Sequence, residues 1–431
     1  MRFIIKAILL VSSLALINSI NCEAQGTLNE RLRIDLQLTG TKDSCSVSLV
    51  SITKEPLFSC PQKSYLDTFK YGEFSYELVD NKTDRIYFSS GFSSLFNEWQ
   101  VGSTNQHDRF SVGKTLLLPM SNTISSLNIY QHKNGSKKLV GCVTIDPQTI
   151  KSSELTDAIL PQKISYKGNP INKLDILILG DGFAKNDIAD FNSIAKSFMN
   201  SLLAVSPFSK YKNQINFWSI CPIEDKSGIE YCSGNTKLGC KYNTLESDRY
   251  LYTTKNQQIS DIAARTPYDC IIILVNSSKY GGGGIYNDFA VAAAGGEKNF
   301  DVMIHEFGHS FAGLGDEYTY GADTDFVAHT SEPWEPNLTY LIQFDSKWKN
   351  LLAPNTPIPT PDSLAIKYKT GVYEGGGYYT KGVYRPSYNC RMRTTNVNYF
   401  CEVCSRAIDE KIKSYITFEQ KKRTHQPLQN K

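Results

Sequence analysis

The stretch from Asp301 to Tyr318, D-V-M-I-H-E-F-G-H-S-F-A-G-L-G-D-E-Y, constrains this 431-residue chain more than any other. It contains H-E-x-x-H, in which His305 and His309 are four residues apart. On an α-helix, residues with this spacing lie on one face, one turn apart, so both imidazoles can bind one metal ion. Glu306 lies beside them and can reach a water molecule on that ion as a general base.

Apolar side chains surround the motif and argue against the alternative, a helix with two ordinary surface histidines. A helix that is apolar nearly all round is buried, and buried polar groups need partners, which a metal ion would supply. The apolar positions are Val302, Ile304, Phe307, Phe311 and Leu314.

The third metal ligand is expected just after the helix. Gly313 and Gly315 permit a sharp turn, which would bring Asp316 or Glu317 back toward the metal. The pattern resembles that of the metzincins, H-E-x-x-H-x-x-G-x-x-H, with one extra residue before the turn and a carboxylate in place of the third histidine. Asp316, eleven residues after His305, is our first choice, and Glu317 is the second.

A rival class of zinc protease takes its third ligand from a glutamate on a later helix. Glu332 and Glu335 are the nearest candidates, but each precedes a proline. A residue before proline is pushed out of the helical conformation, so this alternative is disfavoured.

Metzincins also place a methionine turn beneath the metal. Met392, in S-Y-N-C-R-M-R, is the only one of the five methionines that follows the motif, and we predict that it forms this turn. The alternative is that Met392 simply fills a gap in the core. Tyr388 and Tyr399 flank this region and are candidates to assist an oxyanion, although the chain has 25 tyrosines.

Three segments together resemble the bacterial immunoglobulin-A peptidase family of zinc metallopeptidases. They are H-E-F-G-H-S-F-A-G-L-G-D-E-Y, the upstream L-D-I-L-I-L-G-D-G-F (174–183) and the downstream C-R-M-R…F-C-E-V-C (390–404). The resemblance implies a metzincin-like fold, one Zn²⁺ ion and endopeptidase activity on a protein or peptide substrate. The family name does not establish the substrate of this chain.

The chain before residue 150 has the pattern of short β-strands. Runs such as R-L-R-I-D-L-Q-L and K-L-V-G-C-V-T-I carry alternating or β-branched residues, and Asn, Asp and Gly separate them. We therefore predict an α+β chain: an antiparallel β-sandwich-like domain (25–150), a linker (151–173) and a metzincin-like α/β catalytic domain (174–417) with a twisted mixed sheet and the H-E-x-x-H helix. A polar tail (418–431) follows.

Within the catalytic domain, strands are expected at 174–179, 214–220 and 270–275, and helices at 187–203, 259–265 and 402–417. Four glycines, Gly281 to Gly284, precede the segment 285–294. We consider this segment as an edge strand that pairs with extended substrate, or as an ordinary strand after a flexible loop.

The N-terminus has the features of a leader peptide. Arg2 and Lys6 precede an apolar run, 7–20, which is too short to span a membrane. We expect export to the periplasm, the cell surface or the medium, with residues 1–24 removed as a signal peptide. Alternatively, Cys22 is acylated as a lipoprotein anchor. The net charge of +3 favours neither nucleic acid nor a membrane surface as a partner.

Eleven cysteines in an exported chain permit disulfides. Cys390, Cys401 and Cys404 suggest either a second metal site or a disulfide that fixes the methionine turn. The sequence offers no fourth ligand close to them, so we favour the disulfide.

The sequence thus predicts a secreted zinc endopeptidase with His305, His309 and Asp316 as metal ligands and Glu306 as the general base. Two alternatives come from other classes of protein. One is a catalytically silent surface binding protein with a structural metal, although such a site would not need Glu306. The other is a metal-dependent amidase that acts on cell-wall peptides.

Overall fold

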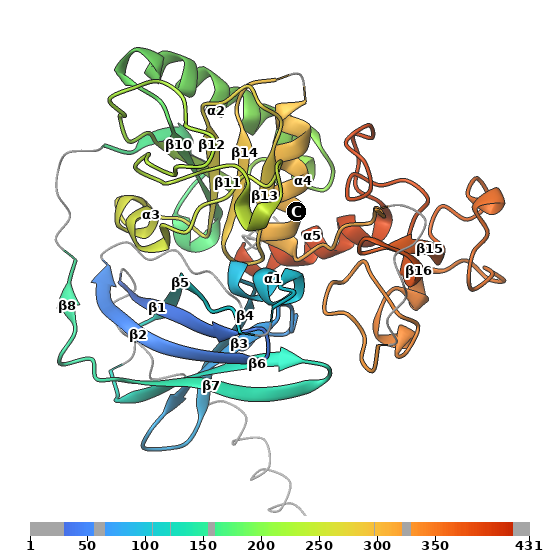
Figure 1. Cartoon of the computed structure of the whole chain (residues 1–431), viewed down its shortest axis with the longest axis horizontal. Coiled ribbons are helices and arrows are strands. Elements are labelled where there is room, and N and C mark those ends of the chain that lie inside the picture. Colours follow the sequence, from blue (N-terminus) through green and yellow to red (C-terminus); the bar gives the residue numbers. More distant parts are fainter. Residues whose placement is uncertain are drawn as a thin grey trace, which may run out of the picture.

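The computed structural model describes residues 30–55, 65–105, 107–120, 122–153, 160–296, 298–320 and 329–416. The predicted leader (1–24), including Cys22, and the polar tail (418–431) lie outside these residues. The described part of the chain is α+β, as predicted, with four sheets and five α-helices (Figure 1). None of these helices is long and apolar enough to cross a membrane.

Two four-stranded sheets form the N-terminal module, with the orders β5–β1–β2–β8 and β4–β3–β6–β7. Burial alternates along strands such as β3, which is the pattern of a strand with one face in the core. The helix α1 (Leu95–Gly102) follows β4. The strands are β1 (Arg31–Thr41), β2 (Ser44–Glu55), β3 (Phe74–Asp80), β4 (Ile86–Phe92), β5 (Phe110–Pro119), β6 (Ser125–Lys133), β7 (Ser136–Ile145) and β8 (Lys151–Ser152).

A six-stranded sheet, β13–β14–β12–β10–β11–β9, organises the second part of the chain. Its four central strands are parallel, and β13 and β9 are antiparallel edges. Every residue of β10 and β11 is buried, which explains their nearly continuous apolar sequences. The strands are β9 (Gln162–Ser165), β10 (Leu174–Asp181), β11 (Ile215–Ile220), β12 (Cys270–Val275), β13 (Gly282–Gly284) and β14 (Phe289–Ala293).

Most predicted elements of this part are confirmed, with shifts of a few residues at their ends. The helices are α2 (Ile188–Ala204), α3 (Asn256–Ala263), α4 (Asn299–Ala312) and α5 (Glu402–Tyr415). The strand β9 lies within the stretch predicted as a linker and joins the sheet at β11. The segment 285–294 is not an edge strand, because its strand β14 lies between β12 and β13. The edge is β13 itself, and Gly282 of β13 is hydrogen-bonded to Arg249 and Leu251 on its outer side.

Side chains of β10 alternate between two hydrophobic clusters. Leu174, Ile176 and Ile178 pack in a cluster with α2, α4 and α5. Leu177 and Leu179 instead join a cluster that continues through the loop 238–252 into β1, β3 and β5. The N-terminal sheets therefore complete the hydrophobic core of the six-stranded sheet.

Polar contacts link the N-terminal module to the segment that precedes β14. Lys114 Nζ on β5 lies 3.1 Å from Asp288 Oδ1, and both side chains are buried. The same ammonium donates a hydrogen bond to the carbonyl of Asn287 at 2.7 Å. Asn287 Nδ2 in turn donates to the carbonyl of Gly91 at 2.6 Å. Removing one partner of a buried ion pair costs several kcal/mol, so these contacts fix the module in place.

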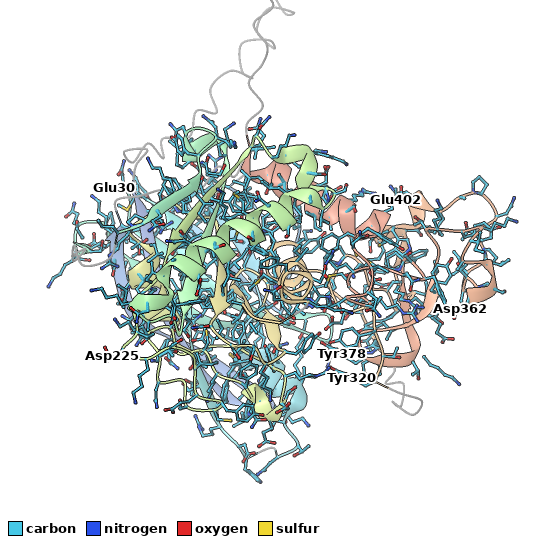
Figure 2. The ribbon with its side chains drawn as sticks, turned by 90° about the horizontal axis from the view of Figure 1, so that it is seen from above. Glu30, Asp225, Tyr320, Asp362, Tyr378 and Glu402 are labelled. Atoms are coloured by element: carbon cyan, nitrogen blue, oxygen red, sulfur yellow. The ribbon has the colours of Figure 1, made fainter. Side chains whose placement is uncertain are left out.

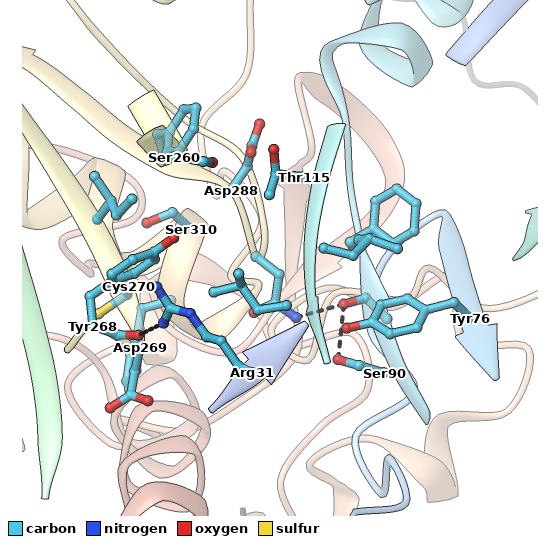
Figure 3. Close-up of a pocket in the computed structure, with 18 of the residues that line it drawn as sticks. Arg31, Tyr76, Ser90, Thr115, Ser260, Tyr268, Asp269, Cys270, Asp288 and Ser310 are labelled. Atoms are coloured by element: carbon cyan, nitrogen blue, oxygen red, sulfur yellow. Dashed lines mark hydrogen bonds between the residues drawn. The ribbon is translucent and has the colours of Figure 1, made fainter. Parts of the chain in front are cut away.

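A cavity of about 130 Å³ lies between the N-terminal strands and the six-stranded sheet (Figure 3). Arg31 and Tyr76 line it from the N-terminal strands, and Tyr268 and Ser310 line it from the other side. Glu55 balances the charge of Arg31, with 2.6 Å between Nε and Oε2. None of His305, Glu306 and His309 lines this cavity, although Ser310, which follows His309, does.

The chain between α4 and α5 is rich in loops and forms an extension on one side of the molecule in Figure 1. It contains one hairpin, β15 (Tyr373–Gly376) and β16 (Tyr379–Arg385). The glycines 375–377 therefore belong to a hairpin with a tight turn rather than to an irregular loop.

Candidate metal centre

The helix α4 carries the H-E-x-x-H motif and ends where the sequence predicts. Gly313 caps it in the left-handed conformation, with φ of +64°. Its N–H donates to the carbonyl of His309 at 3.0 Å, and the N–H of Leu314 donates to the carbonyl of Gly308 at 3.3 Å. Glycine is favoured here because it has no Cβ to strain this conformation. The turn reverses the chain and brings Asp316 to the histidines.

Three ligand atoms converge beyond this turn. His305 Nε2 lies 3.0 Å and His309 Nε2 lies 3.2 Å from Asp316 Oδ1. The two Nε2 atoms are 3.1 Å apart. The structure therefore brings the two predicted histidines and the first-choice carboxylate into one cluster with the composition of a metal site.

Backbone carbonyls fix the protonation of both imidazoles. His305 Nδ1 lies 2.9 Å from the carbonyl oxygen of Arg391, and His309 Nδ1 lies 2.5 Å from that of Leu314. A carbonyl only accepts, so each Nδ1 must carry the hydrogen. In the neutral tautomers, two Nε2 lone pairs and a carboxylate oxygen then face one another. Such a set repels itself unless a cation or a proton lies between its members, so the residues fit a metal ion.

The charges at this cluster also favour a bound cation. Burial alone would lower the pKa of His309, but the charge of Asp316 and its hydrogen bond raise it to about 9. Burial alone would raise the pKa of Asp316, but the two histidines lower it well below its usual range. The carboxylate therefore stays ionised and the site attracts positive charge.

Glu306, the predicted general base, lies against the edge strand. A Cβ added to Gly282 would be 2.9 Å from Glu306 Oε1. Burial raises the pKa of Glu306 above its ordinary value. A carboxylate with a raised pKa is a better proton acceptor near neutral pH.

The four-glycine run has a packing reason that the sequence did not reveal. The edge strand β13 lies so close to α4 that a Cβ on Gly284 would be 2.2 Å from the carbonyl oxygen of Glu306. On the opposite face, a Cβ on Gly283 would be 2.3 Å from the ring of Tyr250. The run is therefore a close contact between strand and helix, and the prediction of a flexible loop is wrong.

Met392 lies directly under the helix, where a methionine turn would be expected. It is fully buried, and a Cβ on Gly308 would be 2.9 Å from its Sδ. Its carbonyl accepts the N–H of Glu317 at 2.8 Å. Met392 thus contacts both the helix that carries the histidines and the segment that carries Asp316.

The second-choice ligand, Glu317, lies elsewhere. Its carboxylate belongs to another buried cluster, with Cys390, Cys401 and Cys404, and not to the cluster of His305. Successive residues in an extended segment point in opposite directions, so Asp316 and Glu317 cannot both face the histidines. The prediction of a disulfide is not borne out either, because all nine described cysteines are free.

Glu332 and Glu335, the candidate ligands of the rival class of protease, lie outside the cluster of His305. Glu332 accepts hydrogen bonds from Thr339 Oγ1 and from the backbone N–H groups of Tyr340 and Gln343, so it organises its own loop. Glu335 is half-buried, and desolvation raises its pKa to about 7. Neither belongs to a cluster of potential metal ligands among the described residues.

Tyr378 is a residue of the site that the sequence did not single out. Its O–H donates to Asp316 Oδ2 at 2.6 Å, on the side of the carboxylate away from the histidines. Its ring stacks on Tyr320, with 5.1 Å between the ring centroids, and the two lie together in Figure 2. The predicted candidates Tyr388 and Tyr399 are instead 38% and 46% exposed. One tyrosine among 25 carries no signal in the sequence.

Glu98, on α1, brings the N-terminal module to the same region. It accepts a hydrogen bond from Tyr250, whose ring packs against Gly283 of β13. Burial raises the pKa of Glu98 to about 8, and the charges of His309 and Glu306 also act on it. The sequence predicted no site residue in this module.

Comparison with known families agrees with this geometry. A model of the family IgA Peptidase M64 matches residues 163–366 and 362–412, and a model of the Peptidase M64 N-terminus matches residues 25–140. The chain belongs to the IgA Peptidase M64 family. No curated protein matches it. Membership of this family makes the chain a peptidase, a hydrolase that acts on proteins or peptides, and confirms the resemblance drawn from the motifs.

The close approach of β13 to α4 yields a test. We expect Gly284→Ala in this M64 peptidase to lower the free energy of unfolding by about 1–3 kcal/mol, because a methyl group would overlap the backbone of Glu306. Gly102→Ala is the matched control, since a Cβ there meets nothing within 4 Å. Urea unfolding of the full chain measures both. Equal stability of the two variants would contradict the packing described here.

Proposed function

We propose that this peptidase is an exported, zinc-dependent endopeptidase with a metzincin-like catalytic centre. The observation that supports it most is the convergence of two Nε2 lone pairs and one Asp316 oxygen within 3.0–3.2 Å. Three protein ligands that leave one position open are typical of catalytic zinc sites, whereas structural sites have four. Nitrogen and oxygen donors of this kind suit Zn²⁺.

His305, His309 and Asp316 would hold the ion. When bound, zinc lowers the pKa of a water molecule and polarises the carbonyl of the scissile bond. In our proposal Glu306 takes the proton of the attacking water and then passes it to the departing amine nitrogen. Its raised pKa suits both steps, because the group must gain and lose a proton near neutral pH.

In this scheme we assign two roles to the O–H of Tyr378. Its hydrogen bond to Asp316 Oδ2 orients the carboxylate so that Oδ1 faces the histidines. Such partners of a ligand commonly change metal affinity or activity by 10–100-fold. Because the O–H contacts a proposed ligand of the centre, we also consider it as a donor to an oxyanion formed there.

Export rests on the sequence alone, from the basic and apolar pattern of residues 2–20. We propose that the leader is removed before Gln25. The intact mass of the chain purified from the producing cells tests this: a mass that begins at Gln25 is expected. A mass that retains residues 1–24, or a lipid on Cys22, would contradict it.

The role of Glu306 has a direct test. Glu306→Gln keeps a side chain of the same shape but cannot accept a proton, so we expect turnover to fall by about 10²–10⁴-fold while bound zinc is unchanged. The measurement is cleavage of a proteome-derived peptide library by the parent and the variant, with zinc quantified in both.

The library also separates the alternatives. Cuts by the parent alone, within peptide chains, support the endopeptidase. Zinc in both proteins with no cuts in either would favour a binding protein with a structural metal. No cuts in the library, together with release of peptides from purified cell walls by the parent alone, would favour the amidase.

The role of Tyr378 is tested with Tyr378→Phe, for which we expect kcat or zinc affinity to fall by about 10–100-fold. A fall in affinity, measured by competition with a chelator, would indicate that the O–H orients Asp316. A fall in kcat alone would indicate a part in the chemical step. Tyr388→Phe, an exposed tyrosine, is the control. No change in either quantity for Tyr378→Phe would refute both roles.

A further inference from the structure

A second cluster of metal-binding side chains lies on the other side of the segment that carries Asp316. It consists of Glu317, Cys390, Cys401 and Cys404, and one ligand atom from each lies within 4.8 Å of all the others. Cys390, Cys404 and Glu317 have no exposed surface, and Cys401 is 8% exposed. Four buried groups with ionisable side chains are costly unless each has a partner.

Within this cluster, not every atom that could bind a metal ion already has a hydrogen-bond partner. The N–H of Cys401 donates to Cys390 Sγ at 3.2 Å, a contact that favours a thiolate at Cys390. Glu317 Oε1 lies 3.1 Å from Cys404 Sγ and 2.9 Å from Asn337 Nδ2, which donates to it. Glu317 Oε2 is buried and has no hydrogen-bond partner among the residues that the structure describes. A buried carboxylate oxygen without a donor requires an explanation, and a cation supplies one.

The start of helix α5 carries two of the three cysteines. Cys401 is its N-cap, and Cys404 lies in its first turn. The N-terminus of a helix carries a partial positive charge and lowers the cost of a thiolate. Arg385 is also buried nearby, and its charge interacts with that of Glu317.

A disulfide explains the cluster less well. It would join two of the three sulfurs and leave the third sulfur and Glu317 Oε2 buried without a partner. A metal ion would use all four groups at once. Three thiolates and one carboxylate make a closed set of four ligands, which is the number found in structural zinc sites. Soft sulfur ligands select Zn²⁺ over the hard cations Mg²⁺ and Ca²⁺.

We propose that Glu317, Cys390, Cys401 and Cys404 bind a second Zn²⁺ ion, which has a structural role. The site joins three segments: the turn after α4, the segment of Met392 and the start of α5. This site adjoins the first cluster. Glu317 directly follows Asp316, and its N–H donates to the carbonyl of Met392 beneath α4. The second ion would thus hold Asp316 and Met392 in register beneath α4. This structural role does not depend on the catalytic role that we propose for the first cluster.

The test uses the full chain purified without chelator, and it reads out metal rather than activity. We expect about two zinc ions per chain in the parent and about one in His309→Ala, because that variant disrupts only the first cluster. The ion that remains should show zinc–sulfur distances of about 2.3 Å in X-ray absorption. After exchange for Co²⁺, the His309→Ala variant should keep the sulfur-to-cobalt charge-transfer absorption.

Substitutions in the second cluster test its proposed ligands directly. Cys404→Ser in the His309→Ala background should remove the remaining ion and the cobalt–sulfur absorption, whereas Cys142→Ser, which replaces an exposed cysteine, should keep both. If Cys404→Ser fails to fold, Glu317→Gln provides a milder change, for which weaker retention of zinc against a chelator is expected.

Two results would overturn the proposal. One is a His309→Ala variant that holds no zinc and shows no cobalt–sulfur absorption on reconstitution. The other is a disulfide between any two of Cys390, Cys401 and Cys404, detected by peptide mass mapping of the unreduced protein. Neither result bears on the first cluster, so a failure here and a failure of the proposed peptidase mechanism are distinguishable. Zinc bound to the second cluster without catalysis would in turn leave this proposal intact.

Discussion

The left-handed turn at Gly313 is the constraint on which both clusters depend. The turn ends α4 one residue after its last helical position and sends the chain back past the histidines. A larger residue would be strained in this conformation, and its Cβ would also lie 2.9 Å from the ring of Trp334. Because the chain returns in an extended form, Asp316 faces His305 and His309, and Glu317 faces the three cysteines. One turn therefore directs one carboxylate to each of two groups of side chains.

Two backbone carbonyls orient the histidines of the first cluster. The carbonyl of Arg391 orients His305, and the carbonyl of Leu314 orients His309. Arg391 is itself fixed by an ion pair with Asp301 at the start of α4, with 2.7 Å between Nη1 and Oδ1. The segment of Met392 thus holds the helix at two levels, near its N-terminus and at the first histidine. Rigid support of this kind is what a metal site needs, since a ligand that is displaced by about an ångström binds poorly.

The sequence predicted those features that depend on local spacing. H-E-x-x-H predicted the helix and the pair of histidines on one of its faces, and the glycines after it indicated the turn to Asp316. Buried strands such as β10 were recognisable as apolar runs, because parallel strands are covered on both faces. The α+β class followed from the same patterns.

The remaining features depend on contacts between distant segments, which periodicity cannot reveal. Glu317 was counted as an alternative ligand of the first cluster because its true neighbours, Cys390 and Cys404, lie more than 70 residues away in the chain. The order of strands in the sheet made β13 the edge and β14 an interior strand, whereas the sequence left open whether the segment 285–294 was an edge strand or an ordinary one. Tyr378 was one of 25 tyrosines, and only its contact with Asp316 distinguishes it.

The shared hydrophobic core has a consequence for how this peptidase can be kept inactive before it reaches its substrate. Many proteases are activated by the removal of an N-terminal segment. Here described residues between 32 and 145 supply side chains to the cluster that contains Leu177 and Leu179, and Lys114 is the partner of the buried Asp288. Cutting the module away would expose this apolar surface to water and leave Asp288 without its cation. Removal of the N-terminal module is therefore expected to destabilise this peptidase rather than to activate it.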